Sequence, residues 1–202
     1  MVTLDGREQE LALGLYRRLA EGEPVSAAAL AADLGRQEAE VAGALEGWPG
    51  LFRAEDGRVI SFWGLAIPEM PHSFRVNGRR LFTWCAWDAL FIPELIGQTA
   101  DVESRPPAGG EKVRLVVEPN AVREVEPETA VVSMLAPAEA FDYRVMTSFC
   151  HYVHFFPSPA EGEEWVAEHE GTFLLSVPEA HELGRLVNRK QFGPLLPSRP
   201  GG

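Results

Sequence analysis

Cysteine is scarce in this chain, because only Cys85 and Cys150 occur among 202 residues. A single pair provides no disulfide framework, and the lack of a Cys-x-x-Cys motif excludes a zinc ribbon. Thiols stay reduced in the cytosol, so the pair indicates chemistry or packing rather than a structural disulfide. A free cysteine usually behaves as a small buried hydrophobe, and each residue taken alone is more simply explained as core.

Long apolar runs and an excess of basic residues are also missing. No apolar stretch approaches the roughly 20 residues that span a bilayer, and residues 1–8 lack the apolar core of a secretory signal. We therefore expect a soluble, cytoplasmic protein without a membrane partner. The formal net charge of −12 repels phosphate backbones unless a basic patch overrides it, so nucleic acid is a poor candidate partner.

The composition that remains is typical of a globular protein, with 46% hydrophobic and 24% charged residues. The length suits one domain or two small ones. In the first third of the chain, residues 7–22, 27–34 and 37–45 are predicted helices and residues 51–62 a predicted β-hairpin. Ser26 and Gly35 bound the second helix, and Asp56-Gly57 is the hairpin turn. This order predicts a winged-helix-like module over residues 1–66.

The third predicted helix argues against DNA recognition. It carries Glu38 and Glu40 where a recognition helix needs base-reading and phosphate-contacting side chains. A packing module that supports the rest of the chain is the simpler interpretation, and a DNA-binding role is kept as the alternative.

Residues 72–192 mix predicted strands and helices, which indicates an α+β domain with a mixed sheet. The predicted strands are 73–76, 79–82, 98–103, 112–118, 129–135, 147–156 and 173–177, and the predicted helices are 84–90, 159–170 and 178–190. Residues 64–71 contain two prolines and are predicted to be a linker, and residues 193–202 a flexible tail.

The segments around the two cysteines have a composition that suits metal chemistry. On a helix capped by Thr83, Cys85 and Asp88 lie at i and i+3 and share a face, and a thiol in the first turn has a lowered pKa. On a strand, Cys150 shares a face with Tyr152. Two thiolates beside a carboxylate can bind a soft metal and move a proton.

Aromatic residues flank both cysteines. Phe82 and Trp84 precede Cys85, and Phe149 precedes Cys150. Such side chains are predicted to form pocket walls that exclude water and accept an apolar substituent. A Cys-x-x-Asp motif is weak by itself, and a Cys-His protease is left without an identifiable oxyanion donor.

Three blocks of the sequence resemble the alkylmercury (organomercurial) lyase family. These are RRLFTWCAWDAL at 79–90, VEP at 125–127 and SFCHYVHFF at 148–156. The resemblance extends over about residues 72–190, and GEPVS at 22–26 is similar to the winged-helix-like module of that family. It implies that residues 72–192 are a lyase-like catalytic domain.

The resemblance also implies a reaction and a set of site residues. The family's two cysteines and one aspartate match Cys85, Cys150 and Asp88, which would cleave the carbon–mercury bond of a small organomercurial by protonolysis. Hg(II) would be held as product by the same residues, without an organic cofactor. Cellular thiols would remove it, and mercuric reductase is an implied partner.

The chain departs from the family at positions outside this catalytic set. His151 stands where many members carry a further cysteine, and Phe82 stands where tyrosine is frequent. Neither position belongs to the catalytic set, so the departures leave the expected lyase activity in place. Two other functions are kept as alternatives. One is a soft-metal (Hg or Cu) binding or sensing protein without turnover, and the other is a winged-helix DNA-binding regulator.

Overall fold

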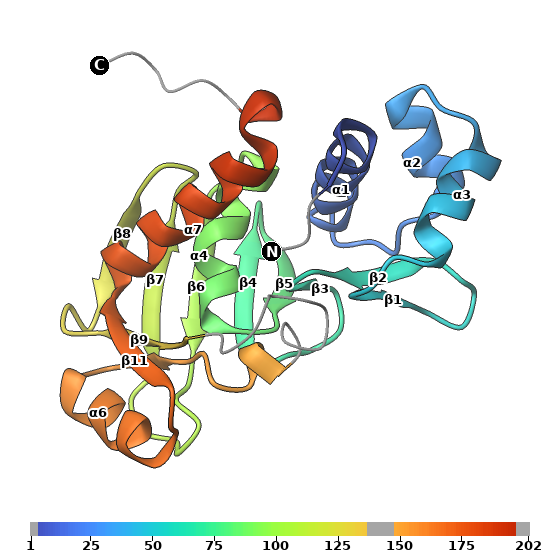
Figure 1. The fold of residues 1–202 in the computed structure, drawn as a ribbon. Coiled ribbons are helices and arrows are strands. Elements are labelled where there is room, and N and C mark those ends of the chain that lie inside the picture. The colour runs from blue at the N-terminus through green and yellow to red at the C-terminus, as the bar shows by residue number, and fades with distance from the viewer. Residues whose placement is uncertain (1–3, 137–147, 197–202) are drawn as a thin grey trace.

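The computed structural model describes residues 4–136 and 148–196. A helical module packs beside a larger part built of sheets and helices (Figure 1). The predicted α+β class with an N-terminal helical module is confirmed. None of the described helices is both long and apolar enough to cross a membrane.

The N-terminal module follows the predicted order. It contains α1 (Gly6–Leu19), α2 (Ala27–Leu34), α3 (Glu38–Glu46), β1 (Leu51–Arg53) and β2 (Val59–Phe62). The Ser26 hydroxyl accepts a hydrogen bond from the Ala29 N–H at 3.1 Å, and Gly35 ends α2 in the left-handed region. The leucines of α1 are buried, as their four-residue spacing predicts.

One large sheet connects this module to the rest of the chain. After β1 and β2 it contains β3 (Leu65–Ala66), β4 (His72–Val76), β5 (Arg79–Thr83), β6 (Ala100–Ser104), β7 (Val113–Val117) and β8 (Val122–Glu126). The strand order is β1-β2-β3-β5-β4-β6-β7-β8. Short turns join most successive strands as hairpins, and every described pairing is antiparallel. The predicted mixture of strand directions is not found among the described strands.

Two segments of this sheet differ from the sequence predictions. The expected linker at 64–71 contains β3, whose Leu65 is fully buried and pairs with both β2 and β5. The strand β8 was not predicted at all, because its burial pattern is largely exposed and gives no clear alternation. The sheet therefore runs without a break through the proposed boundary between the two domains.

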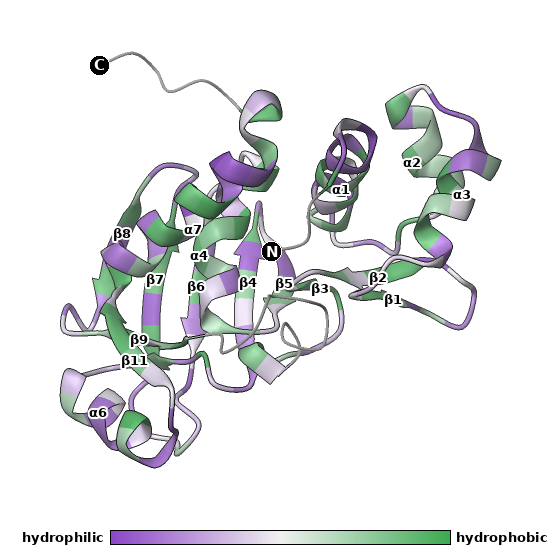
Figure 2. Ribbon diagram, in the orientation of Figure 1, coloured by the Kyte–Doolittle hydropathy of each residue, from purple (hydrophilic) through white to green (hydrophobic). Residues whose placement is uncertain are grey.

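Helix α4 (Ala86–Ile96) occupies the centre of the molecule. It is hydrophobic along most of its length (Figure 2) and lies between the sheet and α7 (Val177–Phe192). A helix buried on nearly all sides has this composition. It continues through Pro93 to Ile96, beyond the predicted end at residue 90.

A smaller sheet completes the fold. Its order is β10-β9-β11, formed by β10 (Phe155–Phe156), β9 (Val131–Leu135) and β11 (Thr172–Ser176), and α6 (Pro159–Glu168) packs on it. The chain then continues into α7 and a short 3-10 helix, Gly193–Leu195, inside the predicted tail. Residues 197–202 of that tail lie outside the described residues.

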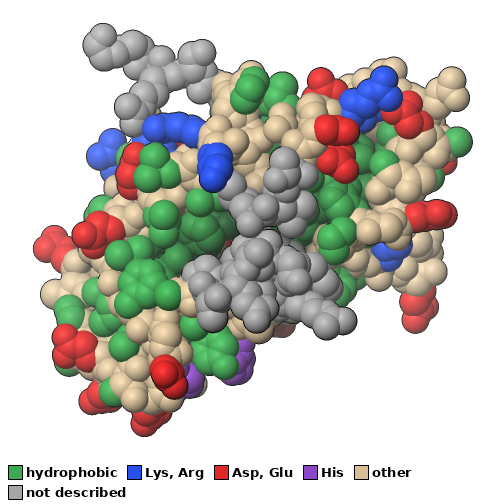
Figure 3. All heavy atoms as spheres, viewed as in Figure 1, with side chains coloured by type: hydrophobic (Ala, Val, Ile, Leu, Met, Phe, Trp, Pro, Cys, Tyr) green, Lys and Arg blue, Asp and Glu red, His purple; other side chains and the backbone are tan. Residues whose placement is uncertain are grey.

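Acidic side chains are spread over both ends of the face shown in Figure 3. This distribution agrees with the formal net charge of −12. The first turn of α3 carries Glu38 and Glu40. These negative charges would repel the phosphates of DNA, so the electrostatic argument against DNA binding by this module still applies.

We predict that the α4–α7 contact limits side-chain size at Gly184. A Cβ added there would lie 2.7 Å from Phe91 Cβ, so Gly184→Ala should lower the free energy of unfolding by about 1–3 kcal/mol through overpacking. Gly43→Ala is the matched control, because Gly43 is helical with open space around it. It should raise stability by about 0.5–1 kcal/mol. Urea denaturation measures both, and equal effects would contradict the tight contact.

Candidate active site

Cys85 lies where β5 passes into α4. It is the N-cap residue of α4 in an extended conformation, so Thr83 is not the cap and Cys85 is not within the first helical turn. The Thr83 hydroxyl instead donates a hydrogen bond to the Cys85 carbonyl at 3.0 Å. Cys85 is fully buried.

Cys150 is positioned by a helical turn, and the predicted strand over 147–156 is wrong. Residues 148–150 are helical, and only Phe155–Phe156 forms a strand; residue 147 lies outside the described residues. Backbone bonds from His151 to Ser148 and from Tyr152 to Phe149 replace a strand ladder. Tertiary context has overridden the β-propensity of this aromatic segment, so the predicted sharing of a strand face does not apply.

The two cysteine segments are joined by their backbones. The Ala86 N–H donates to the Val153 carbonyl at 3.1 Å. This bond ties the first residue of α4 to the turn that follows Cys150. It brings together two segments that lie more than sixty positions apart in the chain.

Cys85, Asp88 and Cys150 converge at one place. The two sulfur atoms and a carboxylate oxygen of Asp88 all lie within 4.8 Å of one another. The Cys85 N–H donates to Asp88 Oδ2 at 2.9 Å, and the Cys150 thiol donates to the same oxygen at 3.9 Å. Cys85 and Asp88 are buried and Cys150 is partly buried, so two soft ligands and one hard carboxylate share a small, largely buried volume.

Burial controls the protonation of this cluster. It raises the pKa of Asp88 to about 7, against hydrogen bonds from Cys85 and Cys150 that lower it. Burial also raises the pKa of the Cys85 thiol well above its ordinary value, with further contributions from Cys150 and from the charge of Asp88. The hydrogen bond with Cys85 lowers the pKa of Cys150, but burial and the Asp88 charge together raise it above the ordinary value.

These shifts overturn the expectation of a lowered thiol pKa at a helix start. Loss of solvent outweighs the helix dipole at a fully buried sulfur. At neutral pH both cysteines are therefore thiols before a metal binds, and Asp88 lies near its midpoint. The groups that can bind a soft metal are therefore also the groups that hold exchangeable protons.

The three predicted pocket residues occupy different surroundings. Phe149 is buried and packs edge-on against Trp87 of α4, with ring centres 5.9 Å apart. Phe82 is buried in β5 beneath the Arg80 guanidinium. Trp84 donates to the Ser61 hydroxyl at 2.8 Å, which directs its ring to the N-terminal hairpin. Their role as pocket walls stays a prediction.

Two residues that interact with Asp88, one by contact and one through its charge, were not predicted from the sequence. Gly64 lies directly against the carboxylate, and Tyr16 of α1 is near enough for the charge of Asp88 to affect its pKa. A Trp63-Gly64 pair between Phe62 and Leu65 is a turn signal that could have indicated the first contact. The contact of α1 with the site has no local sequence signal.

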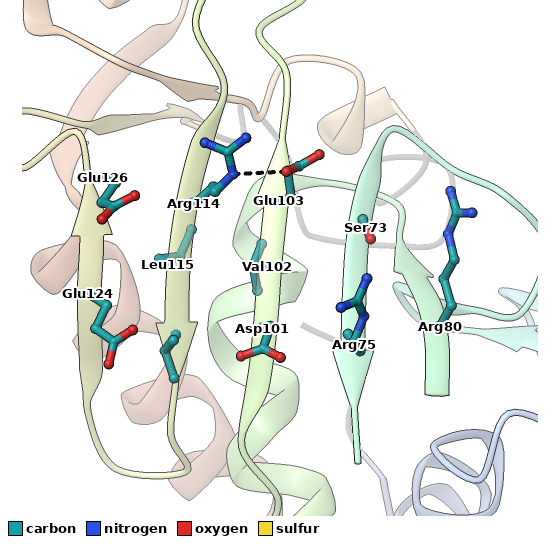
Figure 4. A pocket seen from close by; sticks show the side chains of 11 residues that line it. Ser73, Arg75, Arg80, Asp101, Val102, Glu103, Arg114, Leu115, Glu124 and Glu126 are labelled. Carbon is teal, nitrogen blue, oxygen red and sulfur yellow. Dashed lines mark hydrogen bonds and ion pairs between the residues drawn. The ribbon is translucent and has the colours of Figure 1, made fainter. Parts of the chain in front are cut away.

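A hollow of about 470 Å³ lies elsewhere, on the open face of the large sheet (Figure 4). Arg75, Asp101, Glu103 and Arg114 are among its lining residues, and none of the three cluster residues is. Arg114 pairs with Glu103 at 2.9 Å. Charges of both signs that pair with each other are typical of a solvated sheet face.

We predict a pH-dependent effect of Asp88→Asn on stability. Because burial raises the Asp88 pKa from 3.8 to about 7, the folded state retains a proton that the unfolded state loses, and wild-type stability falls as pH rises between these values. Asn cannot ionise. The free energy of unfolding of Asp88→Asn relative to wild type should therefore increase from about pH 4 to about pH 7 and then stay level. Denaturation at several pH values measures it, and a constant difference would contradict the buried carboxyl.

Comparisons with known proteins give one consistent result. A family described as "Alkylmercury lyase" matches residues 65–188, and one described as "Helix-turn-helix domain of alkylmercury lyase" matches residues 3–63. The alkylmercury lyase of Pseudomonas putida is 46% identical over 176 residues, 87% of this chain and 82% of that protein. The alkylmercury lyase of Staphylococcus epidermidis is 43% identical over 171 residues, 85% and 78% of the two chains.

A solved structure agrees in fold. The mercury-bound form of MerB2 superposes with a TM-score of 0.74 at 20% identity, and the match covers 92% of each chain. The family matches and the curated relatives extend over both parts of the molecule. The chain belongs to the alkylmercury lyase family.

Proposed function

We propose that this protein is an organomercurial lyase that cleaves a carbon–mercury bond by protonolysis. The observation that carries the proposal is the convergence of Cys85, Asp88 and Cys150 within 4.8 Å. The curated relatives named alkylmercury lyase support it. The substrate is a small organomercurial, which offers a soft metal to the sulfurs and an apolar group to the surrounding side chains.

In the proposed reaction, Cys85 and Cys150 bind the mercury of the substrate. Mercury is soft and binds thiolate strongly, so coordination displaces the thiol protons even though the pKa values of both thiols are raised. One proton leaves with the cellular thiol that the organomercurial brought. The other passes to Asp88, whose Oδ2 is the acceptor of the Cys150 thiol.

Asp88 then delivers its proton to the carbon bound to mercury. The carbon–mercury bond breaks, its electron pair forms the new carbon–hydrogen bond, and Hg(II) stays on the two sulfurs. Two thiol protons are consumed, one in the hydrocarbon and one in the released thiol. A pKa of about 7 suits a group that must both accept and donate a proton near neutral pH.

The proposed cycle needs no organic cofactor, because its protons come from the cysteines and its metal comes from the substrate. External thiols remove Hg(II) by exchange, which returns the cysteines to the protonated state. A cytoplasmic location supplies reduced thiols for this step. Mercuric reductase is the proposed consumer of the product.

We predict that the purified protein releases methane from methylmercury in the presence of excess thiol. Cys85→Ala removes one of the two mercury ligands and should abolish release above the thiol-only rate. Gas chromatography measures the methane. Stoichiometric Hg(II) binding without methane would replace the lyase proposal with the metal-binding alternative.

We predict that Asp88→Asn separates binding from turnover. Asn lacks the proton but keeps both sulfurs in place, so the variant should bind Hg(II) stoichiometrically while kcat falls about 10²–10⁴-fold. Asp101→Asn is the matched control, because Asp101 is exposed on the large sheet, outside the Cys85–Asp88–Cys150 cluster. Turnover of Asp88→Asn at the rate of Asp101→Asn would remove the proton-delivery role.

A further inference from the structure

The turn between β2 and β3 is an unusual two-residue hairpin. Trp63 and Gly64 both have positive φ, at 35° and 95°, and Phe62 pairs directly with Leu65 across the turn. Such turns favour Asn-Gly, because left-handed backbone is costly for a bulky side chain. Strain of this kind persists only where the surroundings hold the residue in place.

The N-terminal module supplies those surroundings. The Tyr16 hydroxyl of α1 donates to the Trp63 carbonyl at 2.7 Å, and the indole N–H donates to the Pro49 carbonyl at 2.8 Å. The Trp63 ring stacks on Phe62 with centres 4.7 Å apart. Tyr16 packs edge-on against the same Phe62 ring. Contacts from Tyr16 of α1 therefore hold the turn in its conformation.

The other side of the turn lies against Asp88. A Cβ added to Gly64 would be 2.8 Å from Asp88 Oδ2 and closer still to Cγ and Oδ1. The Gly64 carbonyl accepts from the Trp84 N–H at 2.9 Å. The same glycine thus fixes the strand end that leads to Cys85 and leaves just enough room for the carboxylate.

We infer that the Trp63-Gly64 turn, held in place by the Tyr16 hydrogen bond, is the element that positions the Asp88 carboxylate beside the two sulfurs. The N-terminal module then acts in catalysis by holding this turn, which gives it a function that needs no DNA. Burial, and after it the charge of Asp88, raises the pKa of Tyr16, which agrees with the short path from α1 to the carboxylate. Tyr16 and Gly64 are positioning residues, since they act through Asp88.

The inference rests on the proposed lyase activity, and kinetics with Hg(II) binding test it. Gly64→Ala should lower kcat for methylmercury about 100-fold, because a displacement of about 1 Å has that effect. KM and stoichiometric Hg(II) binding should be unchanged, since both sulfurs stay in place. Tyr16→Phe removes one hydroxyl and keeps the ring, so it should give a smaller loss of kcat in the same direction.

Gly57→Ala is the matched control. Gly57 has a φ of 82° in the neighbouring β1–β2 turn, and a Cβ there meets nothing within 4 Å. It imposes the same kind of backbone cost without touching the site, and its kcat should match wild type.

The outcomes distinguish failure of the positioning role from failure of the proposed lyase function. Wild-type kcat in folded Gly64→Ala and Tyr16→Phe, or an equal loss in Gly57→Ala, overturns the positioning role and leaves the lyase function intact. Loss of Hg(II) binding in parallel with kcat also overturns it, because the whole site has then collapsed. If Gly64→Ala does not fold, Tyr16→Phe decides. A wild-type protein that releases no methane removes both proposals together.

Discussion

The carboxyl group of Asp88 is held out of water beside two sulfur atoms, and the properties of the site follow from that burial. In bulk solvent an aspartate is ionised at neutral pH and a thiol is only partly ionised. Burial raises the Asp88 pKa to about 7 and keeps both cysteines protonated. A soft metal that enters must displace those protons, and Asp88 is the nearest acceptor within the cluster. Binding and proton transfer are thereby linked in one place.

The fold provides this burial by layering. Helix α4 lies between the large sheet and α7, so its N-terminal end carries Cys85 and Asp88 into the core. The backbone bond between Ala86 and Val153 places the Cys150 turn beside that end. The turn at Gly64 closes the remaining side. Three segments of the chain therefore meet at one carboxylate.

Local signals in the sequence predicted much of this arrangement. Capping residues such as Ser26 and Gly35, and the turn at Asp56-Gly57, predicted helices and a hairpin near their observed bounds. The spacing of Cys85 and Asp88 gave one half of the cluster. Cys150 was predicted as a site residue, but its local structure was not, because an aromatic, β-branched segment folds as a turn when its neighbours require it. Gly64 was assigned to a linker, since only the tertiary fold brings it to Asp88.

Both proposed roles of Asp88, accepting a thiol proton and delivering it to carbon, require that its carboxyl group titrates near neutral pH in the resting site. Infrared difference spectroscopy between wild type and Asp88→Asn measures the carbonyl stretch of a protonated carboxyl group directly. We expect a band assigned to Asp88 that is present at pH 6 and disappears as pH rises through about 7. An Asp88 carboxyl that is already fully ionised at pH 5 would contradict it.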